Sequence, residues 1–321
     1  MIGTVSHTAQ VLREVDQVLI LTHRRPDGDT TGSAGALCQA LRKLGKTAYL
    51  APNLGVMRRY ADLVQPYYAP ENFQAQTIIA VDVAAQDMLP PEMEQYADCV
   101  DIVIDHHKFN PCFGKTDNLI GGEFGACAEI IWDLIVELGI ALDESIARSL
   151  YIGTATDTGC FKFTNTTVHT HQVAIACLQA GVDCGDINTV LFDTKSRSRF
   201  EMEKILYDTM QFSCDGKIAA VLVRLEDRKR TGADWDDLDS IAGLPRQIEG
   251  VEVGLTFSEL ENGSTKVSIR TTKEVDAAAI CRQFGGGGHV RAAGATLPYP
   301  AQEAMRRVLE ETEKVYCGKE A

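Results

Sequence analysis

The sequence lacks three features that would each define a class of protein. It contains no stretch of about 18 consecutive apolar residues, which a membrane-spanning helix requires. Its N-terminus, MIGTVSHTAQVLREVDQ, has no basic segment followed by an apolar core, so we expect no signal peptide. Its ten cysteines include no CxxC pair, which removes the main support for a zinc ribbon or a thioredoxin-like motif. We therefore expect a globular protein of the reducing cytoplasm, with no membrane partner and with reduced, mostly buried cysteines.

The sequence also lacks an excess of basic residues. It has 31 Lys and Arg against 45 Asp and Glu, and a formal net charge of −14. A protein that coats long nucleic acid needs a basic stripe, so we expect no long nucleic-acid partner. This composition still allows a short anionic substrate, because such a substrate carries few phosphates and metal ions can supply the positive charge.

The pattern of apolar residues predicts about two domains, which is also what a length of 321 residues favours. In the first half, buried strands are expected at 17–23, 77–84 and 99–107, and helices at 32–46, 124–139 and 143–159. Ser33 is the expected N-cap of the first of these helices and Gly45 closes it, whereas the last is expected to break at Gly153. Alternating strands and helices indicate an α/β domain with a parallel sheet and helices on both faces.

The character of the sequence changes near residue 190. Residues 194–210 are polar and helical, and indicate a connector. Beyond them, strands are expected at 216–227, 251–259 and 265–272, with a turn at Asn262-Gly263 and helices near 276–284 and 301–314. We therefore expect a catalytic domain at 1–190, a helical linker at 191–212, and a smaller α+β domain at 213–321.

Acidic residues and histidines recur at or just beyond the ends of the buried segments in the first half. In open parallel sheets, ligand sites form outside the carboxyl ends of the strands, so side chains far apart in sequence can converge there. The residues concerned are His23, Asp27, Asp29, Asp82, Asp105, His106, His107 and Asp157.

Asp82 carries most of this argument because it lies inside the apolar run IIAVDVA. A bare buried carboxylate costs several kcal/mol unless it is paired. Taken alone, Asp82 could simply end a strand and cap a helix. Together with Asp27, Asp29 and Asp157, it supplies four negative charges, which two divalent ions would balance.

The chemistry of these ligands favours particular metals. Carboxylates with one or two imidazoles suit Mn²⁺ best, with Mg²⁺, Co²⁺ or Fe²⁺ as alternatives, and the absence of thiolates argues against structural zinc. Two such ions can activate a water molecule and stabilise the charge on a phosphoryl group.

Five segments together resemble the DHH phosphoesterase family. HRRPDGDTTGS looks like its first motif, Asp82 in VDVA its second, DHHKFN its third and GTATDTGCFKF its fourth. The downstream FGGGGHVRAAGATL is similar to the glycine-rich signature of the associated C-terminal DHHA1 domain. The resemblance spans nearly the whole chain, and it is greatest to bacterial two-domain enzymes of the nanoRNase and pAp phosphatase type.

The resemblance implies roles for the residues of the first half. It implies one metal ion on His23, Asp27 and Asp82, with Asp157 as an additional contact, and a second ion on Asp29, Asp82, His106 and Asp157. Asp82 would bridge the two ions. His107 would face the phosphate, and Asp105 would orient the histidines.

The second half is expected to hold the substrate. Glycines without Cβ let backbone N–H groups approach an anion, although a glycine run after a helix can also be a plain C-cap. The resemblance favours ligand contact for this run, and an arginine at a comparable place in the family touches the substrate. The implied substrate-binding residues are Arg270, Gly286, Gly287, Gly288, His289 and Arg291.

The resemblance implies hydrolysis of short single-stranded oligoribonucleotides to mononucleotides and of adenosine 3′,5′-bisphosphate (pAp) to AMP, through a hydroxide activated by two metal ions. One alternative is hydrolysis of cyclic di-AMP or its linear product pApA. A weaker one is inorganic pyrophosphatase, which needs a more cationic clamp. An alternative of another class is a non-catalytic nucleotide-binding regulator. Whether the protein is a monomer or a homodimer stays open.

Overall fold

The structure is a computed structural model and describes residues 3–238, 241–272 and 275–317. The chain forms two compact units, Met1–Thr194 and Lys195–Ala321. Among the described residues, no helix is both long and apolar enough to cross a membrane. Cys38, Cys99, Cys112, Cys127, Cys160, Cys177, Cys184 and Cys281 are free thiols.

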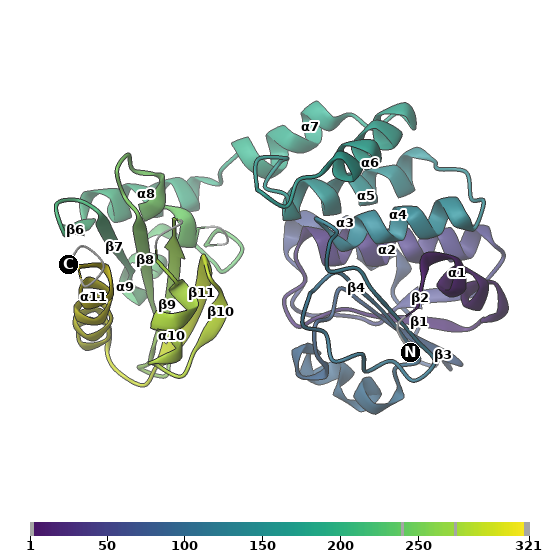
Figure 1. The fold of residues 1–321 in the computed structure, drawn as a ribbon, viewed down its shortest axis with the longest axis horizontal. Coiled ribbons are helices and arrows are strands. Elements are labelled where there is room, and N and C mark those ends of the chain that lie inside the picture. The colour runs from purple at the N-terminus through teal and green to yellow at the C-terminus, as the bar shows by residue number, and fades with distance from the viewer. Residues whose placement is uncertain (1–2, 239–240, 273–274, 318–321) are drawn as a thin grey trace. The chain divides into compact units, whose positions relative to one another are not determined.

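The first unit is built on a five-stranded sheet in the order β2-β1-β3-β4-β5, and all neighbouring strands are parallel (Figure 1). This confirms the expected parallel sheet and adds two short strands, β2 and β5, to the three predicted. The elements are α1 (Val5–Glu14), β1 (Val18–Leu21), α2 (Gly28–Lys43), β2 (Ala48–Leu50), η1 (Arg58–Tyr60), α3 (Ala61–Val64), η2 (Gln65–Tyr67), β3 (Thr77–Val81), η3 (Gln86–Met88), η4 (Pro91–Cys99), β4 (Ile102–Asp105), β5 (Asp117–Ile120), α4 (Cys127–Glu137), α5 (Glu144–Asp157), α6 (Val168–Gln179), α7 (Cys184–Asn188) and η5 (Thr189–Asp193).

The strands of this sheet are buried on both faces, which explains their continuous apolar sequences. Alternate residues such as Ile20 and Ile79 pack against α1, α2, α4 and α5 in the main core. The residues between them, such as Leu19 and Ala80, pack on the other face against Leu89 and the 3₁₀ segment η4. Because successive side chains of a strand point to opposite faces, this sheet lies between two hydrophobic layers.

Two local expectations for the helices were wrong, and both errors concern the site. The N-cap of α2 is Asp27 rather than Ser33, so the helix begins at Gly28. Helix α5 does not break at Gly153 but continues to Asp157. A Cβ at Gly153 would lie 2.7 Å from Cβ of Ala128 on α4, so this glycine lets two helices approach closely rather than ending one.

The second unit contains a six-stranded mixed sheet in the order β10-β11-β9-β8-β7-β6, in which β7 and β8 are parallel and the other neighbours antiparallel. The smaller α+β fold expected for the second half is therefore confirmed. Its elements are α8 (Arg197–Asp208), β6 (Gln211–Ser213), β7 (Ile218–Val223), α9 (Leu225–Thr231), η6 (Ile241–Gly243), η7 (Pro245–Gln247), β8 (Val253–Glu259), β9 (Thr265–Thr271), α10 (Ala277–Arg282), β10 (Gly287–His289), β11 (Ala292–Leu297) and α11 (Ala301–Cys317).

Strand β7, which lies between β8 and the edge strand β6, joins two hydrophobic clusters in this unit. Ala220 and Leu222 face the cluster that contains α10 and α11, whereas Val221 and Val223 face α8. Helix α8 thus packs on the sheet of the second unit, although its polar sequence had indicated a connector. Between β8 and β9 the chain turns at Asn262-Gly263, where Gly263 has a φ of 81°.

The glycine run after α10 is a helix cap in its first half and an edge strand in its second half. Gly285 has a φ of 72°, typical of a helix C-terminus, but β10 then pairs with β11 in an antiparallel hairpin. A Cβ at Gly288 would lie 2.6 Å from the carbonyl oxygen of Ala292, and one at Gly286 would meet the Gly294 carbonyl. At Gly287 a Cβ would meet nothing within 4 Å.

Candidate metal centre

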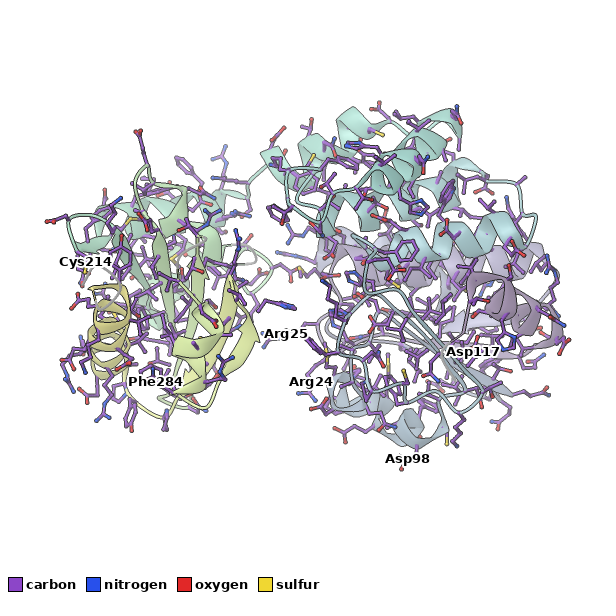
Figure 2. The ribbon with its side chains drawn as sticks, viewed as in Figure 1. Arg24, Arg25, Asp98, Asp117, Cys214 and Phe284 are labelled. Atoms are coloured by element: carbon purple, nitrogen blue, oxygen red, sulfur yellow. The ribbon has the colours of Figure 1, made fainter. Side chains whose placement is uncertain are left out.

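The candidate site lies where three neighbouring parallel strands end. His23 follows β1, Asp82 follows β3, and His106 and His107 follow Asp105, the last residue of β4. Because β1, β3 and β4 are adjacent and parallel, their carboxyl ends meet at one edge of the sheet. Asp117, which Figure 2 labels, is by contrast the first residue of the edge strand β5.

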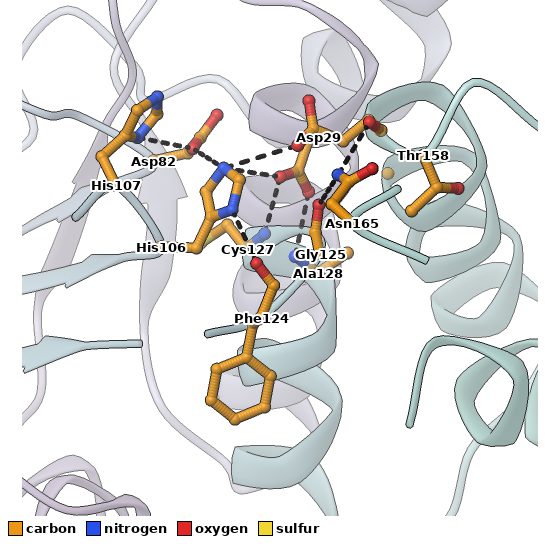
Figure 3. Close-up of polar contacts among 12 residues, drawn as sticks. Asp29, Asp82, His106, His107, Phe124, Gly125, Cys127, Ala128, Thr158 and Asn165 are labelled. Carbon is orange, nitrogen blue, oxygen red and sulfur yellow. Dashed lines mark hydrogen bonds and ion pairs between the residues drawn. The ribbon is translucent and has the colours of Figure 1, made fainter. Parts of the chain in front are cut away.

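Asp82 lies at the centre of the site. Its Oδ2 atom is 3.9 Å from Nε2 of His23, and its Oδ1 atom is 3.6 Å from Nε2 of His106 and 3.7 Å from Nδ1 of His107. The residue is 3 % exposed and has a φ of 57°, an uncommon conformation that Asp tolerates better than most residues. The backbone thus turns sharply as β3 ends and directs the carboxylate among three imidazoles, of which Figure 3 shows those of His106 and His107.

Asp29 lies in the first turn of α2 and is 1 % exposed. Its two carboxylate oxygens accept hydrogen bonds from the backbone N–H groups of Cys127 (2.6 Å) and Ala128 (2.9 Å) at the start of α4 (Figure 3). Because α4 has no side-chain cap of its own, Asp29 supplies one from 98 residues away. Its Oδ2 atom also lies 3.8 Å from Nε2 of His106.

Asp157 and Asp27 complete the acidic group from opposite ends of two helices. Asp157 is the last residue of α5, and its Oδ2 atom lies 3.6 Å from Nε2 of His106. The C-terminus of a helix carries partial negative charge, so a carboxylate there needs a cation nearby. Asp27 is the N-cap of α2, and its Oδ1 atom accepts the N–H groups of Asp29 and Thr30.

The side chains of the site by themselves favour protonated carboxyl groups. Burial, followed by the charge of Asp82, raises the pKa of Asp29 to about 7. Burial, followed by the charge of Asp27, raises the pKa of Asp82 to about 6. Burial and the charges of Asp29 and Asp27 raise the pKa of Asp157 to about 9, although 30 % of its side chain is exposed. The carboxylates repel one another and are removed from water, which is the pattern expected where a cation normally binds.

The donor set fits divalent metal ions. In the described part of the chain, three groups of side chains bring possible ligand atoms within 4.8 Å of one another: His23 with Asp27 and Asp82, Asp29 with His106 and Asp157, and Asp82 with His106 and His107. Among the described residues, the buried Oδ1 atom of Asp82 has no hydrogen-bond partner. A buried carboxylate oxygen without a donor, surrounded by imidazole nitrogens, suits a metal ligand. All six predicted metal ligands occur in these groups, and their roles as ligands stay a prediction.

The hydrogen bonds around the histidines fix their orientation. Nδ1 of His106 lies 3.3 Å from the carbonyl oxygen of Phe124, which leaves Nε2 directed at the three carboxylates. Nδ1 of His107 lies 2.7 Å from Oδ1 of Asp105, and this hydrogen bond raises the pKa of His107. Asp105 is completely buried; burial opposes its ionisation, but its hydrogen bonds with His107 and Asn110 lower its pKa.

The structure adds three side chains that the sequence did not single out. The hydroxyl of Thr30 lies among His23, Asp27 and Asp82. Asn110 donates to Oδ2 of Asp105 at 2.7 Å, and Asn165 donates to the carbonyl oxygens of Gly125 and Asp157 (Figure 3). The only sequence signal for them is their position inside or beside the quoted motifs.

The predicted substrate-binding residues lie on the second unit. Arg270 and His289 both stand opposite Ala292, in one row across β9, β11 and β10. Directly opposed residues point to the same face of a sheet, and here that is the face away from α10 and α11, because Ile269 and Val267 face that core. The next row on this face holds Ser268, Gly294 and Gly287.

The rows place small residues between and beside two side chains that can donate hydrogen bonds. Ala292, Gly287 and Gly294 have little or no side chain. The surface of the sheet is therefore flat beside the half-buried Arg270 and the exposed His289. Arg291 lies at the exposed end of the hairpin.

The structure is that of a two-domain protein. Its first domain carries carboxylate and imidazole side chains that can bind metal ions at the carboxyl ends of the strands of a parallel sheet. The model of the DHH family N-terminal domain matches residues 17–154, and that of the DHHA1 domain matches residues 215–316. A relative from Thermus thermophilus, named bifunctional oligoribonuclease and PAP phosphatase NrnA, is 35 % identical over 94 % of this chain and 91 % of its own. The chain belongs to the DHH family of phosphoesterases.

Solved structures show the same fold. An exopolyphosphatase-related protein from Bacteroides fragilis superposes with a TM-score of 0.87 at 22 % identity, over 98 % of this chain and 97 % of its own. RecJ from Thermus thermophilus, determined in complex with Mn²⁺, superposes with a TM-score of 0.55 at 14 % identity, over 98 % of this chain and 55 % of its own. Phosphoesterases of the DHH family use divalent metal ions, which agrees with the acidic groups described above.

Proposed function

We propose that the protein is a Mn²⁺-dependent phosphoesterase that degrades short oligoribonucleotides to mononucleotides and converts pAp to AMP. The observation that carries this proposal is the similarity, over almost the full length of both chains, to a relative named for these two activities. The three groups of side chains around Asp82 support the metal dependence. The cytoplasm as its location stays a prediction.

We assign the metal ligands to two sets that share Asp82. His23, Asp27 and Asp82 would hold one ion, and Asp29, Asp82, His106 and Asp157 the other. When bound, two divalent ions lower the pKa of a water molecule and neutralise charge on a phosphoryl group. Mn²⁺ is proposed over Mg²⁺, Co²⁺ and Fe²⁺ because imidazole and carboxylate ligands are mixed.

The protein's own side chains would orient the substrate. His107 uses Nδ1 for Asp105, so its Nε2 atom is available to a phosphate oxygen. On the second unit, Arg270 and His289 would bind the terminal phosphate. The flat surface formed by Gly287, Ala292 and Gly294 would let a nucleotide approach the sheet backbone. Such contacts select length and charge rather than base sequence.

A product assay tests this function directly. We expect 5′-labelled RNAs of two to five nucleotides to release mononucleotides and pAp to yield AMP, with Mn²⁺ more effective than Mg²⁺. The same assay includes pApA and cyclic di-AMP. Turnover of cyclic di-AMP far above that of the other substrates would replace the proposal with a cyclic-dinucleotide phosphodiesterase. Tight nucleotide binding without turnover of any substrate would indicate a regulator.

Asn110→Ala is expected to lower kcat about 10-fold or more with the bound metal retained. The substitution removes the donor at 2.7 Å from Oδ2 of Asp105 and so loosens the carboxylate that orients His107. Losses of about 10–100-fold are usual for partners that orient site histidines. Steady-state kinetics and metal analysis of the purified variant check this. Wild-type kcat would remove Asn110 from the orientation of His107.

Gly287→Ala is expected to raise KM about 10-fold and to leave kcat nearly unchanged. The fold tolerates this methyl group, because a Cβ at Gly287 meets nothing within 4 Å, yet the group would stand on the substrate face in the row next to that of Arg270 and His289. Gly243→Ala is the matched control, since a Cβ there also meets nothing within 4 Å. An unchanged KM in Gly287→Ala would remove this face from substrate binding.

A further inference from the structure

Thr30 is a buried residue in the first turn of α2, three residues after the N-cap Asp27. Its hydroxyl oxygen lies 2.5 Å from Oδ2 of Asp82, 2.6 Å from Nε2 of His23 and 3.2 Å from Oδ1 of Asp27. These three residues are the ones that form a single group of possible metal ligands. One hydroxyl therefore contacts every member of that group, and its described hydrogen bonds reach no member of the group formed by Asp29, His106 and Asp157.

The neighbouring Thr31 shows what a threonine at this place does by default. A threonine in a helix usually bonds its hydroxyl to a backbone carbonyl three or four residues earlier. Thr31 does so, donating to the carbonyl oxygen of Asp27 at 2.6 Å. Thr30 could reach the carbonyl oxygen of Asp27 three residues earlier, but its hydroxyl is directed at three side chains. Two of them, His23 and Asp82, follow strands, and the third is the helix cap Asp27. Helix geometry alone does not account for this orientation.

The hydroxyl can hold the three groups at one spacing. It has one proton to donate and two lone pairs with which to accept, so it can donate to a carboxylate of Asp82 or Asp27 and still contact His23. The hydrogen bonds of Thr30 keep all four groups close to one another. Ligands that are already oriented lose less conformational freedom when they bind a metal.

We propose that Thr30 is a positioning residue that sets His23, Asp27 and Asp82 for one of the two metal ions and leaves the other ion to its own ligands. This inference rests on the proposed function, because it assumes a pair of ions in the site. It predicts that loss of this one hydroxyl group weakens the affinity of the protein for one ion and leaves the affinity for the other ion unchanged.

The test is calorimetric titration of metal-free protein with Mn²⁺. Thr30→Val removes the hydroxyl and keeps the shape, Thr30→Ser keeps the hydroxyl, and Thr31→Val is the matched control at a buried threonine that bonds only to backbone. We expect Thr30→Val to weaken one of two binding steps about 10–100-fold. The other step, and both steps in Thr30→Ser and Thr31→Val, should stay near wild type. Electron paramagnetic resonance of the Mn²⁺ pair should show the coupled signal lost in Thr30→Val at metal levels that fill the wild-type protein.

Two results would overturn the inference: equal affinities in Thr30→Val and the wild type, or an equal weakening of both steps. If Thr30→Val does not fold by circular dichroism, Thr30→Ala removes the hydroxyl without added bulk and decides the question in the same way. Failure of the proposed function looks different, because the wild-type protein itself would then bind no pair of ions or hydrolyse none of the substrates.

Discussion

Asp82→Asn is expected to lower kcat/KM for short RNA and for pAp by about 1000-fold or more and to reduce the bound metal below two ions per chain. The carboxylate at the centre of the site would be replaced by a neutral group of the same shape. Metal ions supply several kcal/mol of charge stabilisation to a phosphoryl transition state, and each 1.36 kcal/mol is a factor of ten in rate. Asparagine, like aspartate, tolerates the φ of 57°, so the backbone should be retained.

A second buried aspartate in the same sheet supplies the control. Asp117 is fully buried at the start of β5, where its carboxylate accepts a hydrogen bond from the hydroxyl of Thr8. Asp117→Asn removes a buried charge from the same sheet but not from the metal centre, so two ions and turnover within a few-fold of wild type are expected. Kinetics together with metal analysis of both variants separate the two cases. Near-normal turnover in Asp82→Asn would exclude Asp82 as the shared ligand.

The metal-free protein is expected to become less stable as the pH rises from about 5 to about 9. Burial and mutual repulsion raise the pKa of Asp82 to about 6, of Asp29 to about 7 and of Asp157 to about 9, against an ordinary value of about 3.9 in the unfolded chain. In this window the folded chain binds more protons than the unfolded chain, so the free energy of unfolding falls with rising pH. Burial lowers the pKa of His106, but the charges of Asp29 and Asp82 outweigh this effect and raise the pKa overall, so His106 also makes the folded chain less stable as the pH rises. Burial lowers the pKa of His23, which has the opposite effect on stability.

Bound metal should reverse this trend, because metal ions compete with protons for the same oxygens. A ligand at about 100 times its Kd adds about 2.7 kcal/mol, which corresponds to roughly 5–10 °C in Tm for a domain of 150–250 residues. Thermal unfolding at pH 5.5 and 8.5, with chelator or with Mn²⁺, measures both effects. We expect a larger rise in Tm with Mn²⁺ at pH 8.5. An equal rise at both pH values, or a chelated protein whose Tm increases with pH, would contradict the account.

The carboxyl ends of the strands could be predicted from the sequence because the signal there is local. Short apolar runs ending in Asp82 and in Asp105-His106-His107 indicate buried parallel strands, and parallel strands bring their ends to one edge. The strands β2 and β5 were not predicted, since β2 has three residues and β5 begins with the polar pair Asp117-Asn118. Neither strand contributes a residue to the metal centre.

The parts of the site that escaped prediction depend on contacts between distant segments. The N–H groups of Cys127 and Ala128 fix Asp29, and nothing in the local sequence shows that α4 begins beside it. The break expected at Gly153 was wrong because the glycine serves the contact of α5 with α4, whereas sequence shows only its low helix propensity. The strand β10 was not predicted because glycine has a low strand propensity, and its pairing with β11 determines the structure.

The most direct test of the account is a crystal structure of the protein with Mn²⁺, recorded with anomalous diffraction from manganese. We predict two manganese peaks at the carboxyl edge of the first sheet, one next to His23 and Asp27 and the other next to Asp29, His106 and Asp157, with Asp82 touching both. Absence of manganese from this edge, or a single ion that leaves Asp82 without a metal contact, would contradict the claim that a pair of cations holds these acidic side chains together.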